Sequence, residues 1–266
     1  TNPVRKYLRP EPDAEKLFCF LYPSELVSLL KCKDIPLARR VFYALATFTG
    51  QRKGSLLAQK WKHVDSQHGT LASFKTKTGR AQYFVADRGL MALLEAWHLL
   101  RGKPDDDEPI VRESELEVKG GAKRVAGVLR KDLKTANVTR AILFEDKADN
   151  VEPLRFHDLR STFCTWARRA GKSDAWISER TGHDVDGKMI ARYDRGAQTL
   201  SDLNYEPFPD VTWAVPELVE IRARLATSLA TAANAQKKKA SETCEIPEAY
   251  AVGAIGVEPT TPTVSR

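Results

Sequence analysis

The 266-residue chain has no apolar run long enough to cross a membrane, and its amino terminus lacks the charged-then-apolar pattern of a secretory signal. The sequence therefore predicts a cytoplasmic protein without membrane contact. Its four cysteines, Cys19, Cys32, Cys164 and Cys244, form no CxxC pair. No acidic, Cys or His cluster has metal-ligand spacing and no internal repeat is present. We accordingly expect no metal and no cofactor.

Positive charge exceeds negative charge, with 42 Lys and Arg residues against 35 Asp and Glu, a net charge of +7 and a pI near 9.2. A basic balance favours polyanions, because counterions are released from a phosphate backbone. The excess lies in residues 52–80 and 119–140, each with seven basic residues and one acidic residue. The carboxylates of residues 105–117, between them, are expected to lie away from DNA. The alternative for each basic segment is a solvated helix face.

Apolar periodicity and capping residues predict a mostly helical chain with one hairpin. A Pro-Ser-Glu start opens a helix at Pro23, and Gly171 and Gly182 end two later ones. Residues 211–229 carry a further apolar-rich stretch, with Pro216 as a helix opener. The Ala, Lys, Thr and Pro composition of residues 232–266 predicts a poorly ordered tail. The predicted helices are 36–49, 54–61, 90–100, 122–136, 157–170, 175–180 and 189–193, and the predicted strands are 71–74 and 82–85.

Polar side chains in five short motifs carry the chemistry of this sequence. The motifs read TGQR at 49–52, KTKTG at 75–79, RFHDLRSTF at 155–163, TGH at 181–183 and IARY at 190–193. Taken alone, each of these side chains is more often a packing or surface residue. Their order and spacing favour a common site, whose candidate catalytic residues are Arg52, Lys77, His157, Arg160, His183 and Tyr193.

These residue types suit the attack of a tyrosine on a phosphodiester. Such an attack builds negative charge on the non-bridging oxygens, which two guanidiniums can hold with forked donors; Arg52 and Arg160 are the candidates. An imidazole can donate a hydrogen bond to the same phosphate or transfer a proton, and His157 and His183 are the candidates for these roles. A phenol is a weak nucleophile at neutral pH, so we expect a cationic cluster around Tyr193 that favours the phenolate.

In order and interval these residues resemble the catalytic domain of the tyrosine recombinase (phage integrase) family over residues 22–205. The two arginines are 108 residues apart, and Tyr193 follows Arg160 by 33. The resemblance implies an α+β fold, mostly helical with a small antiparallel sheet, shared with type IB topoisomerases. It implies that Lys77, rather than nearby Lys75, is the hairpin lysine that protonates the leaving 5′ oxygen. It also implies cleavage and rejoining of DNA through a 3′-phosphotyrosine, without metal or ATP.

The chain departs from the family pattern at three places. Ser55 stands where an acidic residue usually follows the first arginine, and residues 191–195 lack the common paired aromatic and the following histidine. Only about twenty residues precede the catalytic domain, so we expect the amino-terminal core-binding domain to be absent and residues 1–21 to form an arm or linker. Residues 206–231 are expected to hold a helix that docks either on a neighbouring protomer or on its own domain.

Three functions fit these residues. The first is site-specific recombination of a mobile element, integration or excision, by four protomers on paired double-stranded DNA sites, with the protein associated with the nucleoid. The second is nicking and closing of one duplex, as by a type IB topoisomerase. The third is a DNA-binding regulator with an inactive pocket. The residues expected to contact DNA are Lys53, Lys75, Arg80, Lys123, Arg124, Arg130 and Lys131.

Overall fold

The structure, a computed structural model, describes residues 19–74, 81–117, 122–144, 152–182, 193–224, 226–227 and 231. Contacts divide the chain into Thr1–Ala223 and Arg224–Arg266, and the account below concerns the first unit. Its described elements are α2 (Pro23–Lys31), α3 (Leu37–Thr49), α4 (Lys53–Leu57), η1 (Trp61–His63), β1 (Val64–Asp65), β2 (Thr70–Ser73), β3 (Gln82–Val85), α5 (Arg88–Leu100), η2 (Glu113–Leu116), α6 (Ala122–Thr135), η3 (Ala141–Leu143), α7 (Asp158–Arg169), α8 (Asp174–Thr181) and α9 (Asp194–Asp202).

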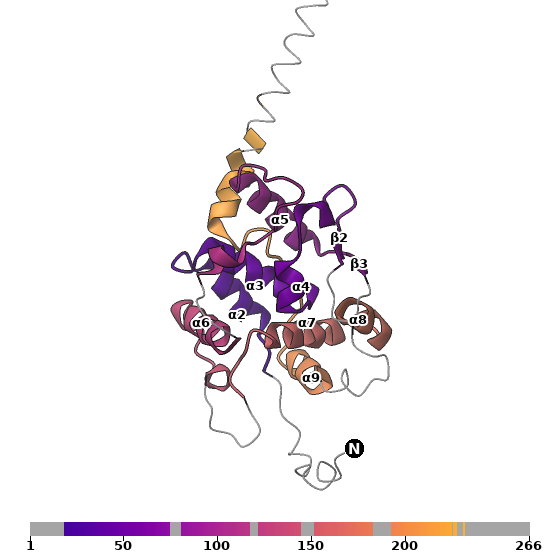
Figure 1. Cartoon of the computed structure of the whole chain (residues 1–266). Helices are drawn as coiled ribbons and strands as arrows, with labels where there is room; N and C mark the ends of the chain where they lie inside the picture. Colours follow the sequence, from indigo (N-terminus) through magenta and orange to yellow (C-terminus); the bar gives the residue numbers. More distant parts are fainter. Residues whose placement is uncertain are drawn as a thin grey trace, which may run out of the picture. The chain divides into compact units, whose positions relative to one another are not determined.

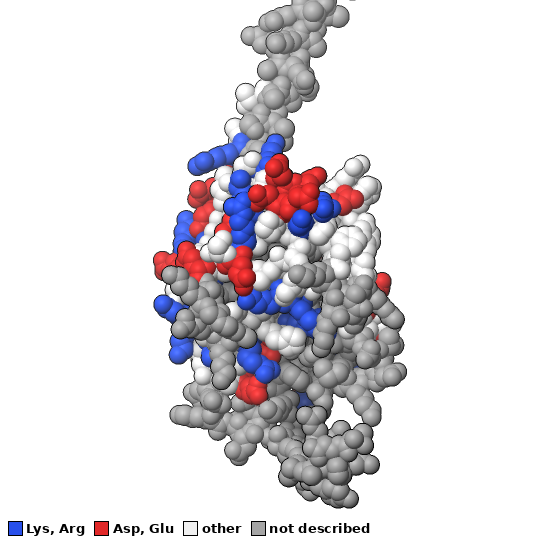
Figure 2. Space-filling view, in the orientation of Figure 1, with Lys and Arg blue, Asp and Glu red and all other residues white. Residues whose placement is uncertain are grey.

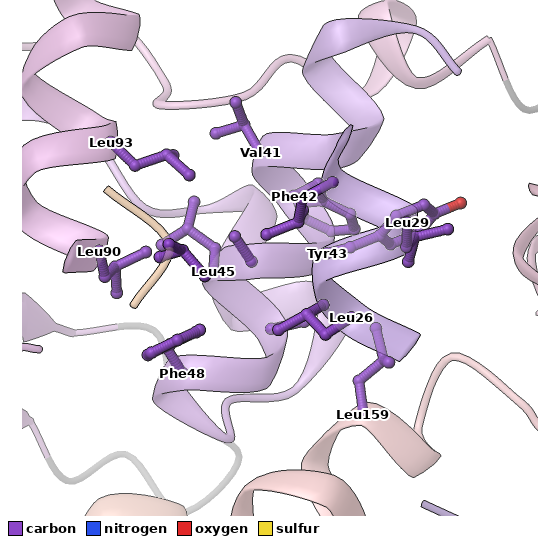
Figure 3. Close-up of a cluster of buried hydrophobic side chains, with 14 of the residues drawn as sticks. Leu26, Leu29, Val41, Phe42, Tyr43, Leu45, Phe48, Leu90, Leu93 and Leu159 are labelled. Carbon is purple, nitrogen blue, oxygen red and sulfur yellow. The ribbon is translucent and has the colours of Figure 1, made fainter. Parts of the chain in front are cut away.

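Helix α3 is the centre of this unit, with α2, α5 and α7 packed around it (Figure 1). Leu45 and Phe42 of α3 are almost fully buried, as the apolar spacing of 36–49 predicts. Each such side chain contributes about 1.5–3 kcal/mol when it leaves water. Figure 3 shows side chains from these four helices converging on one core, among them Leu26, Leu29, Val41, Phe42, Tyr43, Leu45, Phe48, Leu90, Leu93 and Leu159.

Gly50 ends α3 and turns the chain toward the first basic segment. Its φ is +63°, and its N–H donates to the carbonyl oxygen of Ala46. A Cβ at this position would lie 2.4 Å from Cδ1 of Phe163 on α7. Only glycine meets both conditions, because other residues rarely adopt a left-handed backbone and none lacks the Cβ. The end of α3 is thereby held against α7, with Arg52 two residues beyond the turn.

A small antiparallel sheet holds the predicted hairpin. Its strands run in the order β1-β2-β3, with Leu71 opposite Phe84 and Thr70 opposite Val85. The predicted strands 71–74 and 82–85 therefore correspond to β2 and β3, whereas the two-residue β1 was not predicted. Residues 75–80, which link β2 to β3, lie outside the described residues.

The predicted helix over 54–61 is wrong in its second half. Helix α4 ends at Leu57, and the following residues pair with the chain near residue 108. The N–H of Trp61 donates to the carbonyl oxygen of Glu108, and the N–H of Ile110 donates to that of Gln59. These bonds replace the i to i−4 bonds that a longer helix would have used. Apolar periodicity carries no information about a hydrogen-bond partner that lies so far away in the sequence.

Residues 206–223 belong to the first unit by their contacts. Val211, Val215 and Leu218 are buried in the main core, and the chain is helical from residue 216. Glu217 accepts from both Nη1 and Nη2 of Arg40, at 2.9 and 2.5 Å. The start of this helix therefore packs on its own unit. The predicted tail, 232–266, lies outside the described residues.

Candidate active site

Arg160 joins three segments that are far apart in sequence. It lies in the first turn of α7, is only 2% exposed, and donates from Nη1 to the carbonyl oxygen of Gly50 at 2.7 Å. Its Nη2 donates to the carbonyl oxygen of Thr181, at the end of α8. Burial and, to a smaller degree, the positive charge of Arg52 lower the pKa of Arg160 to about 10. The side chain stays cationic at neutral pH, in an orientation that two carbonyl groups fix.

Arg52 and His157 lie beside this fixed guanidinium. Arg52 is the residue before α4, half-buried, and His157 is the residue before α7. Partial desolvation of the His157 ring, followed by the charge of Arg160 and smaller effects that include Arg52, lowers the pKa of His157. The imidazole is therefore neutral at neutral pH. The structure thus brings together Arg52 of one sequence motif with His157 and Arg160 of another.

Tyr193 belongs to the same neighbourhood, but its hydroxyl is buried. The residue precedes α9, is 5% exposed, and packs with Phe163, Cys164 and Ile177 in a second apolar cluster. Its hydroxyl is hydrogen-bonded to Ser161 and Cys164 on α7. Burial, the largest cause, raises the pKa of Tyr193 to about 12, against the opposing effects of Ser161 and Arg160. The expectation that cations favour the phenolate does not hold in this arrangement, because desolvation outweighs them.

Ser161, Cys164 and Gly50 are site residues that sequence analysis did not assign. Cys164 is buried, and its contact with Tyr193 was not predicted. A helical signal was available: Cys164 follows Arg160 by four residues, so both project from the same side of α7. The contact between Gly50 and α7 joins residues more than a hundred positions apart and has no comparable local signal.

Two of the six candidate catalytic residues cannot be placed. Lys77 and His183 lie outside the described residues, as do Lys75 and Arg80 of the predicted DNA contacts. Lys123 and Arg124 fall within α6, but their side chains are also outside the described part of the chain. Residues 183–192, which include most of the predicted helix over 189–193, are likewise undescribed.

The predicted basic surface over residues 52–80 is partly neutralised by the acidic stretch 105–117. Lys53 pairs with Glu113 at 3.2 Å, and Asp107 pairs with Lys60 and Lys62 at 3.0 and 2.7 Å. Side-chain hydrogen bonds from Lys62 and Lys60 lower the pKa of Asp107 to about 2. Figure 2 shows Lys and Arg side chains gathered over α4, with an Asp and Glu cluster above them. The basic segment 52–80 and the acidic stretch 105–117 are therefore in contact.

A cavity of about 800 Å³ lies between α6 and the start of α7. Arg130 of α6 lines it and donates to the carbonyl oxygen of Leu154 at 2.8 Å. Lys131, the next residue, is exposed. The remaining lining residues are Gln51, Lys53, Val125, Ala126, Glu152, Pro153, Arg155, Phe156 and His157.

Within the described ranges, no three His, Cys, Asp or Glu side chains are grouped as a metal ion would require. Nor does any helix of that part of the chain have the length and apolar character needed to span a membrane.

The chain is similar to known proteins in sequence and in fold. A model described as the phage integrase family matches residues 19–199. The integrase of Salmonella phage P22 is 27% identical over 188 residues, which are 69% of this chain and 45% of that protein, so the chain spans less than half of this relative. XerA recombinase has a TM-score of 0.54 at 19% identity, over 73% of this chain and 68% of its own. A lambda integrase dimer bound to a COC' core site has a TM-score of 0.53 at 21% identity, over 74% and 53%. The predicted mostly helical fold with a small antiparallel sheet is confirmed.

Proposed function

The chain belongs to the phage integrase family, and from that premise we propose that it is a site-specific DNA recombinase acting through a 3′-phosphotyrosine at Tyr193. Its substrate is double-stranded DNA, and its role is the integration or excision of a mobile element. One observation carries the proposal: Arg160 is fixed by the carbonyl groups of Gly50 and Thr181 beside Arg52, with His157 and Tyr193 in the same neighbourhood.

The proposed reaction conserves the energy of the phosphodiester. The oxygen of Tyr193 attacks phosphorus, a tyrosyl–phosphate bond forms, and the bond to the 5′ oxygen breaks. Arg52 and Arg160 stabilise the charge on the non-bridging oxygens. The leaving 5′ oxygen takes up a proton, which by family resemblance comes from Lys77, while His183 completes the phosphate contacts. Attack by a 5′ hydroxyl reverses these steps, so that rejoining requires neither ATP nor a metal.

Tyr193 must release a proton before or during its attack, because its raised pKa keeps it protonated at neutral pH. His157 is suited to accept that proton, since its lowered pKa leaves the imidazole neutral. The phenol must also exchange its bonds to Ser161 and Cys164 for the phosphate. We infer a resting arrangement, from which DNA draws the hydroxyl toward Arg52 and Arg160.

The decisive experiment traps the covalent intermediate. Nicked suicide duplexes that tile the DNA around the gene are incubated with the protein, and a protein–DNA adduct is sought on denaturing gels. We expect an adduct with the wild-type chain that persists in excess chelator and is absent with Tyr193→Phe, although the variant still folds and binds DNA. Adducts with the Phe variant would reject Tyr193, and loss of cleavage in chelator with recovery in magnesium would reject the metal-free mechanism.

Nicking and closing of a single duplex is the second candidate. Val211, Val215 and Leu218 pack within their own unit. This packing favours the single-duplex activity, because this part of the carboxy-terminal segment does not need a neighbouring protomer to bury its apolar side chains. Recombination instead requires assembly of four protomers, which we propose to involve residues beyond this packed part. Relaxation of a supercoiled plasmid with one site, without recombinant product from a plasmid with two, would identify the single-duplex activity.

A further inference from the structure

Apart from His157, the residues that line the cavity of about 800 Å³ have no role in the reaction proposed above. Gln51 and Lys53, the two neighbours of Arg52, line it, and so does His157. A phosphate held by Arg52, His157 and Arg160 therefore lies next to this cavity. The nucleotide on one side of that phosphate is therefore close enough to contact the wall of the cavity.

The wall combines cationic groups with apolar surface. Arg130 and Arg155 supply the charge, and Val125, Ala126 and Phe156 supply apolar surface. Arg155 is paired with Glu152 and Asp158, whereas no carboxylate in the described part of the chain pairs with Arg130. A nucleotide has the complementary parts, an anionic phosphate joined to a flat base.

Gln51 gives this wall a specific polar group. The residue is 3% exposed, and neither Nε2 nor Oε1 of its amide has a hydrogen-bond partner among the described residues. Gln59 is equally buried and its Oε1 is also unpaired, but its Nε2 donates to the carbonyl oxygen of Ala72 at 3.3 Å. Burial of an unpaired amide lowers stability, so Gln51 requires a partner that arrives with the substrate or a water molecule.

The two unpaired atoms of this buried amide indicate which partner fits once the side chain turns toward the cavity. A phosphate offers only acceptors, whereas the edge of a nucleobase places a donor beside an acceptor, the pattern that a glutamine pairs with in a bidentate manner. We propose that the cavity binds the nucleotide next to the scissile phosphate, with its base edge on Gln51 and its phosphate near Arg130. This inference rests on the proposed function. A base that enters the cavity leaves the stack, which strand exchange requires in any case, and the cost is lowest beside a nick.

Nucleotide binding can be tested without cleavage. The full chain is titrated with dAMP, dGMP, dCMP and TMP at millimolar concentrations, and the shift in melting temperature is recorded. We expect a stabilising shift that neither inorganic phosphate nor a deoxynucleoside alone reproduces. Gln51→Met should weaken the affinity by about tenfold or more, and Gln59→Met should leave it unchanged. An equal shift with inorganic phosphate means an adventitious ion only and overturns the proposal, as does no shift with any nucleotide.

The same two variants separate a ligand-binding role from a structural one. Gln51→Met replaces an unpaired amide by an apolar side chain of similar size, so the melting temperature of the free protein should stay the same or rise. Gln59→Met removes a buried hydrogen bond and should lower it. A drop for Gln51→Met as large as that for Gln59→Met would show that the Gln51 amide is satisfied by water, and would overturn the proposal.

DNA provides the second measurement. In a nicked duplex that yields the wild-type adduct, each nucleotide beside the scissile phosphate is replaced in turn by an abasic residue. On the nicked duplex that keeps all its bases, Gln51→Met should slow adduct formation about tenfold. On the duplex that is abasic at the bound position, the same substitution should have little further effect. Wild-type adducts with equal slowing on all duplexes would overturn the cavity assignment alone. Absence of any wild-type adduct would instead reject the proposed function, and the nucleotide titration would still decide the cavity.

Discussion

The two candidate clamp arginines are held in different ways, and this difference predicts different responses to a lysine. Lysine keeps the positive charge but lacks the two parallel N–H donors of a guanidinium. Both Arg52→Lys and Arg160→Lys should therefore reduce the single-turnover cleavage rate by about 100- to 1,000-fold. Only Arg160→Lys should also lower the melting temperature, because it loses bonds to the carbonyl groups of Gly50 and Thr181. DNA affinity, measured by gel shift, should change little for either.

Arg168→Lys is the matched control, since Arg168 lies at the far end of α7 and pairs with Asp174 and Asp194. It should cleave at the wild-type rate. Parallel losses of binding and cleavage in Arg52→Lys would instead place Arg52 among the backbone contacts.

The pH dependence of cleavage reports which residue gives up the proton. The pKa of Tyr193 is raised to about 12 and that of His157 is lowered from its ordinary value. If His157 takes the proton during attack, the rate rises through the pKa of His157, below about 6.5, and is then flat to mildly alkaline pH. A prior phenolate would instead give a rise of about tenfold per pH unit across that range. We expect the flat profile in single-turnover assays, and its ascending limb should vanish in His157→Gln.

His157 also links stability to pH. Its folded-state pKa is lowered, so the neutral ring favours the native state above the unfolded pKa of about 6.5, and that contribution is lost as the pH falls through the folded value. Because His157 is exposed, this contribution should be small: melts of His157→Gln should lose slightly less stability just below a pH of about 6.5 than melts of the wild-type protein.

At the scale of elements, the geometry of the candidate site depends on the turn that follows α3. Gly50→Ala would place a Cβ 2.4 Å from Phe163 in a left-handed backbone, and should lower the free energy of unfolding by about 2–4 kcal/mol. Cleavage should fall further than stability accounts for, because the carbonyl group of Gly50 orients Arg160. Denaturant melts and adduct assays below the melting temperature measure the two effects.

Gly69→Ala is the control for backbone strain alone. Its φ is +65°, but a Cβ there meets nothing within 4 Å, so only about 1–2 kcal/mol should be lost and cleavage should be retained. Equal effects of the two substitutions would show that contact with Phe163 contributes nothing.

The elements that sequence predicted well are those whose information is local. Helix α3 and the strands of the hairpin have apolar spacing, and Gly171 and Gly182 do follow the helices they were expected to end. The end of α4 was not predicted, because Gln59 and Trp61 bond to residues near 108. The buried hydroxyl of Tyr193 was not predicted either, because a motif gives the residue type at a site and not the competition between burial and charge.

At the scale of the whole molecule, the net positive charge suggests more basic surface for DNA than the structure leaves unpaired. Lys53, Lys60 and Lys62 are paired with carboxylates of residues 105–117, and each pair must break before the lysine can contact a phosphate. Exposed pairs of this kind contribute about 0–1 kcal/mol, so DNA can displace them. The chain should therefore bind DNA weakly and with a steep dependence on salt.

Glu113→Gln tests this competition. Freed from its partner, Lys53 should add about 0.9 to the slope of log affinity against log salt for one extra phosphate contact, and affinity should rise most at low salt. Glu95→Gln on α5 changes the net charge equally and should leave the slope unaltered. Fluorescence anisotropy over a salt series measures both. An identical gain from the two variants would attribute the effect to net charge and not to Lys53.

The bridge that Arg160 makes between Gly50 and Thr181 has a consequence during synthesis. A ribosome delivers residue 50 first, residue 160 more than a hundred residues later, and residue 181 later still. Until that last segment has emerged and folded, the guanidinium has only one of its two carbonyl anchors, and the proposed nucleophile at residue 193 has not emerged at all. If the proposed function holds, a prematurely terminated chain should therefore attract DNA through its basic segments without cutting it.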